Sequence, residues 1–488
     1  MLIVTCLSLF GLVLACLYYW YKRPRSFPPG PRGIPFLGVI PFLGKIPERV
    51  LFKWSKIYGP VMSLRIGRKD WISLNDYDSI NQALAKQHTK FSGRPKNPVY
   101  AQFNQGCGVV RIDYGALWKS QRKFGLTTLR GFGVGKRSME DRIVEEAAFM
   151  NEWVRSQNGK AFSPLDILHK AAASNIGSVV FGQRFDYDDE ILNKLISLIT
   201  GVYDNAAANF ALQCMNLAPI LMNIPPFSTL NHHIVNTFNT LLELLHNFIE
   251  QHKKTFQKNE LRDFIDAFLK EMDEGNPGFT DDQLVQYVRD LFSAGTDTTA
   301  TTLNWGLICL LHYPQIQTKL REEILKVVGL TSPVRLSHAA DLHYTNAFIQ
   351  ELMRFRTIVP LSVFHKTNEN AEINGFVIPK DTGIMVNLWA VHNDPDYWKE
   401  PDIFKPERFI DEKGNFVKSS HLVAFSVGPR HCLGEQLARM EVFLFLVSLV
   451  QNFEFLPDPD SGELPPLDCP VSGFIFTPSC YKIFANNV

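Results

Sequence analysis

Apolar residues recur at three- and four-residue spacings over most of the chain beyond residue 115, which is the pattern of amphipathic and buried helices. One such stretch, at about 281–311, is long enough to form a single helix through a core. Near the amino end, two apolar runs flank a polar turn within residues 61–74, and this arrangement predicts a β-hairpin. Short strand-like pieces reappear at 371–377 and within 464–488. The pattern therefore predicts a mainly α fold with minor β structure.

The first 21 residues carry no charged side chain and are mostly aliphatic or aromatic. At about 1.5 Å per residue, roughly 20 helical residues reach about 30 Å, the thickness of a bilayer core. Aromatic residues 18–21 and the cations Lys22, Arg23 and Arg25 follow, as is typical of an uncleaved anchor whose chain continues in the cytosol. We therefore expect a transmembrane signal-anchor at residues 1–21. The alternative is a cleaved signal peptide, which should begin with basic residues and end in a cleavage site.

Residues 27–31 read Phe-Pro-Pro-Gly-Pro, and so many prolines form a stiff, non-helical spacer. We expect a basic, proline-rich hinge at residues 22–38 and one catalytic body over residues 39–488. Residues 216–227 form another apolar segment that contains two adjacent prolines. This segment is either a core loop or a segment that dips into the membrane.

The 488 residues carry a formal net charge of +1, which gives no overall attraction to nucleic acid. The eight cysteines are scattered, without a C-x-x-C pair or zinc-finger spacing, so neither a disulfide framework nor structural zinc is expected. No N-x-[ST] acceptor for glycosylation occurs. Candidate chemistry is therefore confined to a few local motifs.

The most informative motif runs from Phe425 to Gly434 and reads Phe-Ser-Val-Gly-Pro-Arg-His-Cys-Leu-Gly. Its two glycines, Gly428 and Gly434, let the backbone approach a bulky, flat ligand. Cys432 lies at a predicted helix start, where the first N–H groups and the helix dipole favour a thiolate, a strong electron donor to haem iron. Arg430 is placed to pair with an anionic group on the same ligand, such as a haem propionate.

This motif resembles, at every fixed position, the haem-binding loop of the cytochrome P-450 monooxygenases, Phe-x-x-Gly-x-Arg-x-Cys-x-Gly. Residues 294–299 (Ala-Gly-Thr-Asp-Thr-Thr), 351–354 (Glu-Leu-Met-Arg) and 404–409 (Phe-Lys-Pro-Glu-Arg-Phe) match further motifs of this family in the same order. Several segments are most similar to the animal microsomal family-two enzymes. The resemblance covers nearly the whole chain and implies the cytochrome P-450 fold. It also implies heme b with Cys432 as the axial thiolate ligand.

The resemblance implies an activity: insertion of one oxygen atom from O2 into a lipophilic substrate, such as a xenobiotic, fatty acid or steroid. The glycine-threonine patch at 294–299 would leave space for O2, although helix packing alone also explains a glycine there. Thr298 would hydrogen-bond the bound oxygen, and Asp297 would order the water chain that delivers protons. An acid and an alcohol suit this chemistry because O–O cleavage consumes protons. The implied cofactor contacts are Arg94, Trp118, Arg122, His365, Phe425, Gly428, Arg430 and Gly434.

Other matching residues receive structural or binding roles. Glu351, Arg354 and Arg408 would form a buried triad that supports haem insertion. A basic face would receive NADPH-cytochrome P-450 reductase, with cytochrome b5 as a further electron donor, and comprises Lys119, Lys123, Arg130, Lys136, Arg137 and Arg439. The substrate pocket is expected along 99–107, Phe292, Ala294, 358–364 and 471–475. Residues 356–358 (Arg-Thr-Ile) depart from the family's His-Pro-rich stretch, so the substrate stays open.

These inferences place the enzyme in the endoplasmic reticulum membrane with its catalytic body facing the cytosol. Two alternatives remain. A haem-thiolate isomerase or dehydratase would act on peroxides without NADPH, and such enzymes often lack the acid–alcohol pair. A non-enzymatic haem sensor or carrier would have no need for the proton-delivery residues.

Overall fold

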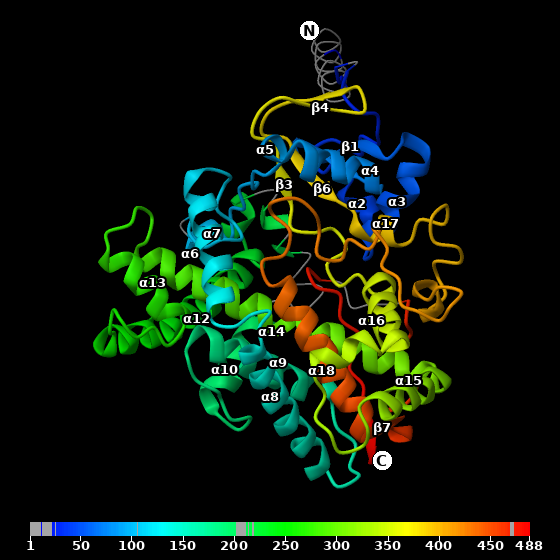
Figure 1. The fold of residues 1–488 in the computed structure, drawn as a ribbon. Coiled ribbons are helices and arrows are strands. Elements are labelled where there is room, and N and C mark those ends of the chain that lie inside the picture. The colour runs from blue at the N-terminus through cyan, green and yellow to red at the C-terminus, as the bar shows by residue number, and fades with distance from the viewer. Residues whose placement is uncertain are drawn as a thin grey trace.

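Helices dominate the protein, and a small sheet lies towards its amino-terminal end (Figure 1). The computed structural model describes residues 11, 22–24, 26–104, 106–201, 211–212, 214–216, 219–468 and 473–488. The α-helices are α2 (Ile40–Leu43), α3 (Pro47–Tyr58), α4 (Tyr77–Asn81), α5 (His88–Phe91), α6 (Ala101–Asn104), α7 (Ala116–Gly131), α8 (Arg137–Ser156), α9 (Pro164–Val180), α10 (Glu190–Thr200), α12 (Phe227–Thr255), α13 (Phe264–Asp273), α14 (Asp281–His312), α15 (Pro314–Val327), α16 (His343–Phe355), α17 (Leu388–His392) and α18 (Glu435–Asn452). The predicted mainly α fold with minor β structure is confirmed.

The strands of the described residues form one four-stranded sheet and two strand pairs. In the larger sheet the order is β1 (Val61–Ile66), β2 (Lys69–Leu74), β6 (Gly383–Val386) and β3 (His365–Lys366). β1 and β2 pair antiparallel, which confirms the predicted hairpin, whereas β2 and β6 pair parallel. The remaining antiparallel pairs join β4 (Ala371–Ile373) to β5 (Phe376–Ile378) and β7 (Phe453–Pro457) to β8 (Ile483–Asn487).

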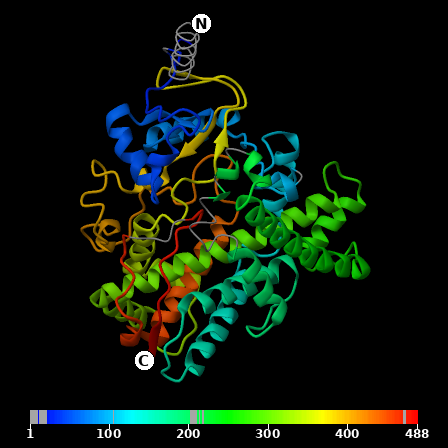
Figure 2. The same cartoon turned by 180° about the vertical axis from the view of Figure 1, so that it is seen from behind.

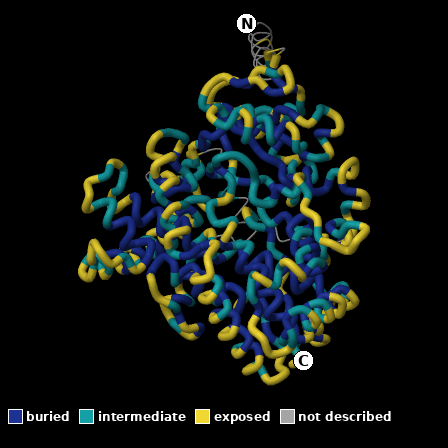
Figure 3. Tube along the Cα trace, viewed as in Figure 1, coloured by how far each residue is buried: buried dark blue, intermediate teal, exposed yellow. Residues whose placement is uncertain are grey.

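Helix α14 runs through the middle of the helical region, as Figure 2 shows from behind. Thr280 caps its amino end by accepting a hydrogen bond from the N–H of Gln283 at 3.3 Å, and Asp281 and Asp282 complement the helix dipole. The helix packs against α9, α12, α16 and α18, so most of its residues are buried. Figure 3 shows buried chain in this central region and exposed turns around it. α14 therefore holds Asp297 and Thr298 on a rigid element.

The proline-rich stretch is hydrogen-bonded to the sheet. The carbonyl of Pro29 accepts a hydrogen bond from the N–H of Ser63 at 2.8 Å. A Cβ on Gly30 would lie 1.9 Å from the carbonyl oxygen of Ser63, so no other residue fits this close approach. The expected hinge at residues 22–38 is thus attached to β1 by its proline-rich part, and this part is continuous with the body.

No helix among the described residues is long and apolar enough to cross a membrane. The anchor expected at residues 1–21 lies outside the described residues, except for Gly11. Within the apolar segment at 216–227, the structure describes a short 3-10 helix, in which Ile220 is 70% exposed, and Ile224 after it is 46% exposed. These two side chains do not belong to a core loop.

Candidate functional site

The loop that carries Cys432 lies directly before α18, near the centre of Figure 1. The N–H of Cys432 donates a hydrogen bond to the carbonyl of Phe425 at 2.9 Å, which closes the turn. Cys432 is exposed, yet burial raises the pKa of its thiol, so the residue faces a hollow inside the protein. The N–H of Gly434 and the guanidinium groups of Arg122 and Arg439 lower this pKa by less. The N–H of Gly434 at the helix start thus acts in the expected direction, towards a thiolate, and a bound metal ion would favour deprotonation further.

The two glycines of this loop differ in what surrounds them. Gly428 has a φ of +79°, and a Cβ there would lie 1.8 Å from the carbonyl oxygen of Leu84. Backbone packing therefore requires this glycine. Among the described residues, no atom lies within 4 Å of the position of a Cβ on Gly434, so this glycine borders open space. Gly434 therefore leaves room beside the loop for a flat ligand.

Two arginines flank the indole ring of Trp118 next to this loop. The guanidinium carbon lies 4.3 Å from the ring centroid for Arg430 and 5.7 Å for Arg122. Arg430 donates hydrogen bonds to the carbonyls of Ser92 and Ile112, both at 2.8 Å, so its position is fixed. Its buried Nη1 has no hydrogen-bond partner among the described residues. Arg430 therefore retains a donor for a ligand.

Arg94 and His365 lie in the same cluster of charged and polar groups. Arg94 donates to three backbone carbonyls at 2.9, 2.9 and 2.7 Å, and burial together with the positive charge of Arg430 lowers its pKa. Nδ1 of His365 lies 2.9 Å from the carbonyl oxygen of Phe91, and burial together with Arg94 lowers the pKa of this imidazole. Beside these arginines His365 is neutral and donates its Nδ1 proton to Phe91, and a nearby propionate would offset the arginine charge and favour a proton on Nε2.

This set of side chains fits a dianionic ligand. Arg94, Arg122 and Arg430 repel one another in a buried region, and burial lowers the pKa of each. The nearby carboxylate of Asp113 is paired with Lys366 at 2.7 Å. The two propionates of haem would supply the missing negative charge, because buried charges need partners. The chemistry of the cluster and the adjacent thiol therefore fit haem.

Thr298 and Asp297 have different surroundings although they are adjacent in the chain. Thr298 lines a cavity of about 50 Å³ together with Phe425, and its hydroxyl donates to the carbonyl of Ala294 at 2.7 Å. Asp297 pairs with His169 of α9, with 3.1 Å between Oδ1 and Nε2. The hydroxyl of Thr298 thus lies at the cavity, whereas the carboxylate of Asp297 contacts a residue of a neighbouring helix.

Two further contacts explain this part of α14. A Cβ on Gly295 would lie 2.9 Å from Cγ1 of Ile176 in α9, so close helix packing requires the glycine. The hydroxyl of Thr299 donates to Oε2 of Glu441 at 2.8 Å, and Asn175 donates to the other oxygen. Burial raises the pKa of Glu441 to about 7. Close packing of α14 on α9 therefore accounts for a glycine at position 295.

The predicted triad of charged residues forms as expected. Arg354 donates to both carboxylate oxygens of Glu351, at 2.7 and 2.8 Å, and both side chains are fully buried. Nε of Arg408 lies 3.4 Å from Glu351. Arg354 also donates to the carbonyls of His392 and Pro401 at 2.8 and 2.9 Å. This network joins α16 to the segment before the cysteine loop and has a structural role.

The basic residues of the expected docking face are largely exposed: Lys119, Lys123, Arg130, Lys136 and Arg137. Arg439 is instead ion-paired with Glu435 at 2.9 Å. A Cβ on Gly135 would lie 1.9 Å from Nε2 of Gln436, so the loop after α7 touches the start of α18. The cations of α7 and of the loop after it therefore lie beside the cysteine-bearing segment.

The expected substrate-lining stretches are distributed unevenly. Ile358 lines the cavity that Thr298 borders, and Ala294 is exposed on α14. Phe292 is fully buried, with its ring centroid 5.5 Å from that of Phe181. Residues 471–472 lie outside the described residues.

Sequence reasoning missed His169 and Glu441. A lone histidine or acid within a helical pattern carries no signal of its partner, because each of these contacts joins distant parts of the chain. For Arg356 a signal existed, since it begins the stretch that departs from the family pattern.

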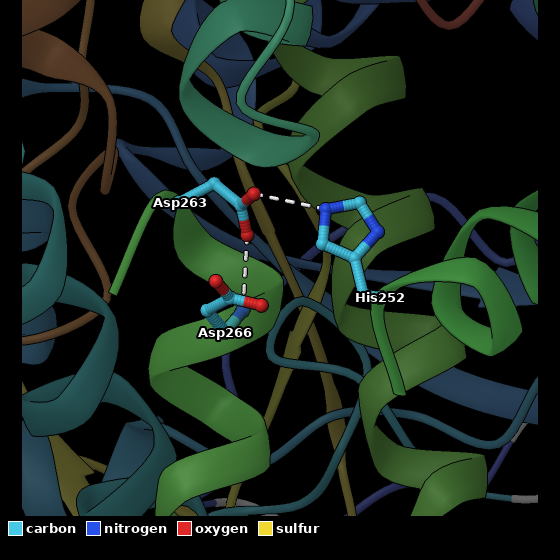
Figure 4. Close-up of side chains that lie close together, drawn as sticks. All are labelled: His252, Asp263 and Asp266. Carbon is cyan, nitrogen blue, oxygen red and sulfur yellow. Dashed lines mark hydrogen bonds and ion pairs between the residues drawn. The ribbon is translucent and has the colours of Figure 1, made fainter. Parts of the chain in front are cut away.

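A second cluster of titratable groups lies where α12 meets α13 (Figure 4). Nε2 of His252 is 2.9 Å from Oδ2 of Asp263, and its Nδ1 is 2.7 Å from the carbonyl oxygen of Phe248. Oδ1 of Asp263 accepts the N–H of Asp266, whose carboxylate is bound at both oxygens by Arg262 at 2.6 and 2.8 Å. The ligand atoms are therefore already used, and the cluster joins two helices.

The fold and this site define a haem-thiolate protein: a mainly helical body with a cysteine loop before a buried helix and a cationic cluster beside it. The model of the family Cytochrome P450 matches residues 28–484, and the chain belongs to this family. It is similar to Cytochrome P450 2U1 of Bos taurus, with 36% identity over 94% of this chain and 90% of the relative. It is similar to Cytochrome P450 2J2 of Homo sapiens, with 37% identity over 93% of this chain and 90% of the relative. It is also similar to Cytochrome P450 2C41 of Canis lupus familiaris, with 36% identity over 99% of this chain and 98% of the relative.

The family carries the cofactor and the reaction class with it. The protein is a haem-dependent monooxygenase, an oxidoreductase whose iron has a cysteine thiolate ligand and whose electrons come from NADPH through a reductase.

Proposed function

We propose that Cys432 is the axial ligand of heme b in an enzyme that inserts one atom of O2 into a lipophilic substrate. One observation carries this assignment: an exposed thiol faces an internal hollow beside buried arginines, of which Arg430 has an unpartnered donor. When bound, haem supplies the activation of O2. The proposed cofactor contacts are Arg94, Trp118, Arg122, His365, Phe425, Gly428, Arg430 and Gly434.

The side chains of Thr298 and Asp297 would hold and transfer the protons that the reaction consumes. The hydroxyl of Thr298 borders the cavity and would hold a proton where oxygen is activated. Asp297 would supply protons through ordered water, and its contact with His169 orients the carboxylate. Because Asp297 binds His169 and not Thr298, the two residues act through water and not through a direct hydrogen bond.

The carbon-monoxide difference spectrum of the reduced, membrane-bound protein tests the ligand. The wild type and a Cys309→Ala control should give a strongly red-shifted Soret band, and Cys432→Ala should lose it. Cys309 is a suitable control because it is a fully buried cysteine of α14, with a pKa raised by burial to about 12. An unshifted band in the wild type would refute thiolate ligation. Turnover without NADPH would favour the isomerase or dehydratase alternative.

The electron donor would be NADPH-cytochrome P-450 reductase, with cytochrome b5 as a second donor, docked on the exposed cations beside the cysteine loop. Charge reversal at Lys123 and Arg130 should slow the first electron transfer several-fold and flatten its salt dependence. Both cations would attract the reductase over a distance, and dissolved salt screens such attraction. Rapid mixing with reductase under carbon monoxide measures this step. The control is Lys254→Glu on α12, and equal rates in all three proteins would exclude the docking face.

The enzyme would be held in the endoplasmic reticulum membrane by residues 1–21, with residues 22–38 as the hinge and residues 39–488 as the catalytic domain in the cytosol. Exposed apolar side chains near the amino end support a membrane-facing surface: Phe36 is 73% exposed and Phe42 53% exposed. A variant without residues 1–21 should move from the membrane fraction towards the supernatant, and full retention would refute the anchor.

A further inference from the structure

Arg356 follows the end of α16 and borders two cavities. The larger is the one that Thr298 and Phe425 line. The smaller, of about 10 Å³, is lined by Glu48, Arg49, Trp305, Phe355, Arg356, Thr357, Ile358, Trp389 and Phe476. Arg356, Thr357 and Ile358 border both, so one guanidinium group is placed between the candidate oxygen site and a second, polar recess.

The guanidinium of Arg356 is poorly satisfied. Its Nη1 donates to the carbonyl of Phe355 at 3.0 Å, and its buried Nε has no hydrogen-bond partner among the described residues. The group packs on the rings of Phe355 and Trp305, with 3.9 and 5.1 Å to the centroids. No carboxylate of the described residues lies within ion-pair distance. A buried cation in this state lacks an anionic partner.

The smaller cavity holds a second unsatisfied cation. Arg49 donates to the backbone carbonyl of Asp468 at 2.7 Å, and its buried Nε has no partner in the described part of the chain. Glu48 does not compensate for these charges, because burial raises its pKa to about 7 and its buried Oε2 is also unpartnered there. Burial and the nearby Arg49 lower the pKa of Arg356 to about 10, against the opposing effect of Cys309. The recess therefore combines two guanidinium groups with a carboxyl group that is partly protonated near neutral pH.

This recess is separate from the candidate propionate cluster. The charged neighbours of Arg356 are Arg49, Arg354 and Asp468. Those of Arg94 are Arg430, Arg111, Arg122 and Asp113. Haem has two carboxylates, and the second set of arginines already offers donors for them. Since no carboxylate of the described residues pairs with Arg356, we expect its anionic partner to come from another molecule.

We propose that Arg356 and Arg49 bind the carboxylate of a lipophilic substrate, and that the apolar part of this substrate extends into the cavity bordered by Thr298. The inference rests on the proposed function, because it names the substrate class of the same site. A guanidinium group suits a carboxylate because it offers parallel donors. Ile358, Phe476 and Trp305 supply apolar walls for the hydrocarbon part. A protonated Glu48 adds a donor, and a neutral lipophile would leave both cations unpaired.

Binding of a matched pair of ligands to the full-length holoenzyme tests this subsite. Palmitic acid and its methyl ester share one hydrocarbon chain and differ in the charged group. The shift of the haem spectrum with ligand concentration gives each dissociation constant. The wild type should bind the acid about tenfold more tightly than the ester, as expected for a hydrogen bond between charged groups. Arg356→Gln should lose this preference, Arg49→Gln should reduce it, and Arg356→Lys should retain part of it.

Arg321→Gln is the control, because Arg321 is also partly buried and bound to carbonyls, at 3.3 and 2.6 Å, but borders neither cavity. Equal binding of acid and ester by the wild type would overturn the inference. An equal loss for both ligands in Arg356→Gln would overturn it as well. The carbon-monoxide band of each preparation separates this failure from failure of the proposed function: an intact red-shifted band leaves the monooxygenase standing without the carboxylate subsite.

Discussion

Arg354 and Arg356 are close in the chain, yet their surroundings are opposite. Arg354 is fully buried, and its guanidinium is bound to Glu351 and to the carbonyls of His392 and Pro401. Arg356 donates one hydrogen bond to its neighbour Phe355 and leaves a buried Nε unpartnered among the described residues. The same side chain therefore serves the fold at one position and is left available at the other.

The difference shows how a buried charge should be interpreted. A cation with every donor satisfied stabilises the packing around it, and its removal leaves an uncompensated partner. A cation at a cavity whose donors lack partners lowers the stability of the fold. Such a residue is retained where a bound ligand supplies the missing partner. Burial alone does not distinguish the two cases, whereas the set of partners does.

The largest effect should come from Arg354→Met. This change leaves the carboxylate of Glu351 in a fully buried position without its main partner. We expect a loss of about 3–5 kcal/mol in the free energy of unfolding, measured by denaturant titration of the holoenzyme. Arg408→Met is the matched control and should cost less, because its Nε lies 3.4 Å from Glu351. A loss below about 1 kcal/mol for Arg354→Met would contradict the structural role.

Glu48 should make stability depend on pH. Its folded pKa of about 7 lies above the ordinary value of 4.5, so the folded state holds the proton more tightly than the unfolded state. The contribution is fully present below pH 4.5 and is lost as the pH rises through 7. It should reach about 3 kcal/mol and be absent in Glu48→Gln. Unfolding of both proteins at acid and neutral pH measures it, and parallel curves would show that Glu48 does not titrate in this range.

Arg356→Met should have the opposite sign to Arg354→Met. Removing a cation that has no anionic partner among the described residues should raise the free energy of unfolding by about 1–2 kcal/mol when no carboxylate ligand is present. The same denaturant titration compares the two variants directly. If Arg356→Met destabilises the protein as much as Arg354→Met does, the two arginines have equivalent roles and the contrast is wrong.

The smallest effect should arise at His252, far from both arginines. Burial is the largest single effect and lowers the pKa of this imidazole. The hydrogen bond and charge of Asp263, with the Phe248 carbonyl and the charge of Asp266, together raise it by more, so the net pKa lies above 6.5. The charged pair should therefore contribute about 1 kcal/mol below pH 6.5 and lose it as the pH rises through the folded pKa. His252→Gln should remove this dependence. His246→Gln, at an exposed histidine, should leave this pH dependence unchanged. Unfolding free energies measured against pH test both variants, and a wild-type value that does not change with pH would contradict the pairing.

Much of the fold could be predicted from local patterns. The hairpin at 61–74 and the helix at 281–311 follow from alternation and helical periodicity, and both are present as β1–β2 and α14. The Glu351–Arg354 pair follows from its spacing on α16. The exposure of the cations on α7 could also be expected, because a charged face of a helix is usually solvated.

Other features of the site could not be predicted. Gly428 was expected to make room for a ligand, but its neighbour is the carbonyl of Leu84. Asp297 was expected to act beside Thr298, but its partner is His169 on another helix. The position of a Cβ or a carboxylate relative to a distant segment depends on how whole elements pack, and local spacing contains no such information.

The amino-acid sequence determined the family, the reaction class, the cysteine loop and the helices that carry the motifs, because each depends on residues that are close together in the chain. Only the tertiary structure decided which buried charges are satisfied. Glu48, Arg49 and Arg356 meet at one cavity although they come from opposite parts of the chain. Electrostatic pairing depends on distance in space and on the exclusion of water, and both are set when the elements pack.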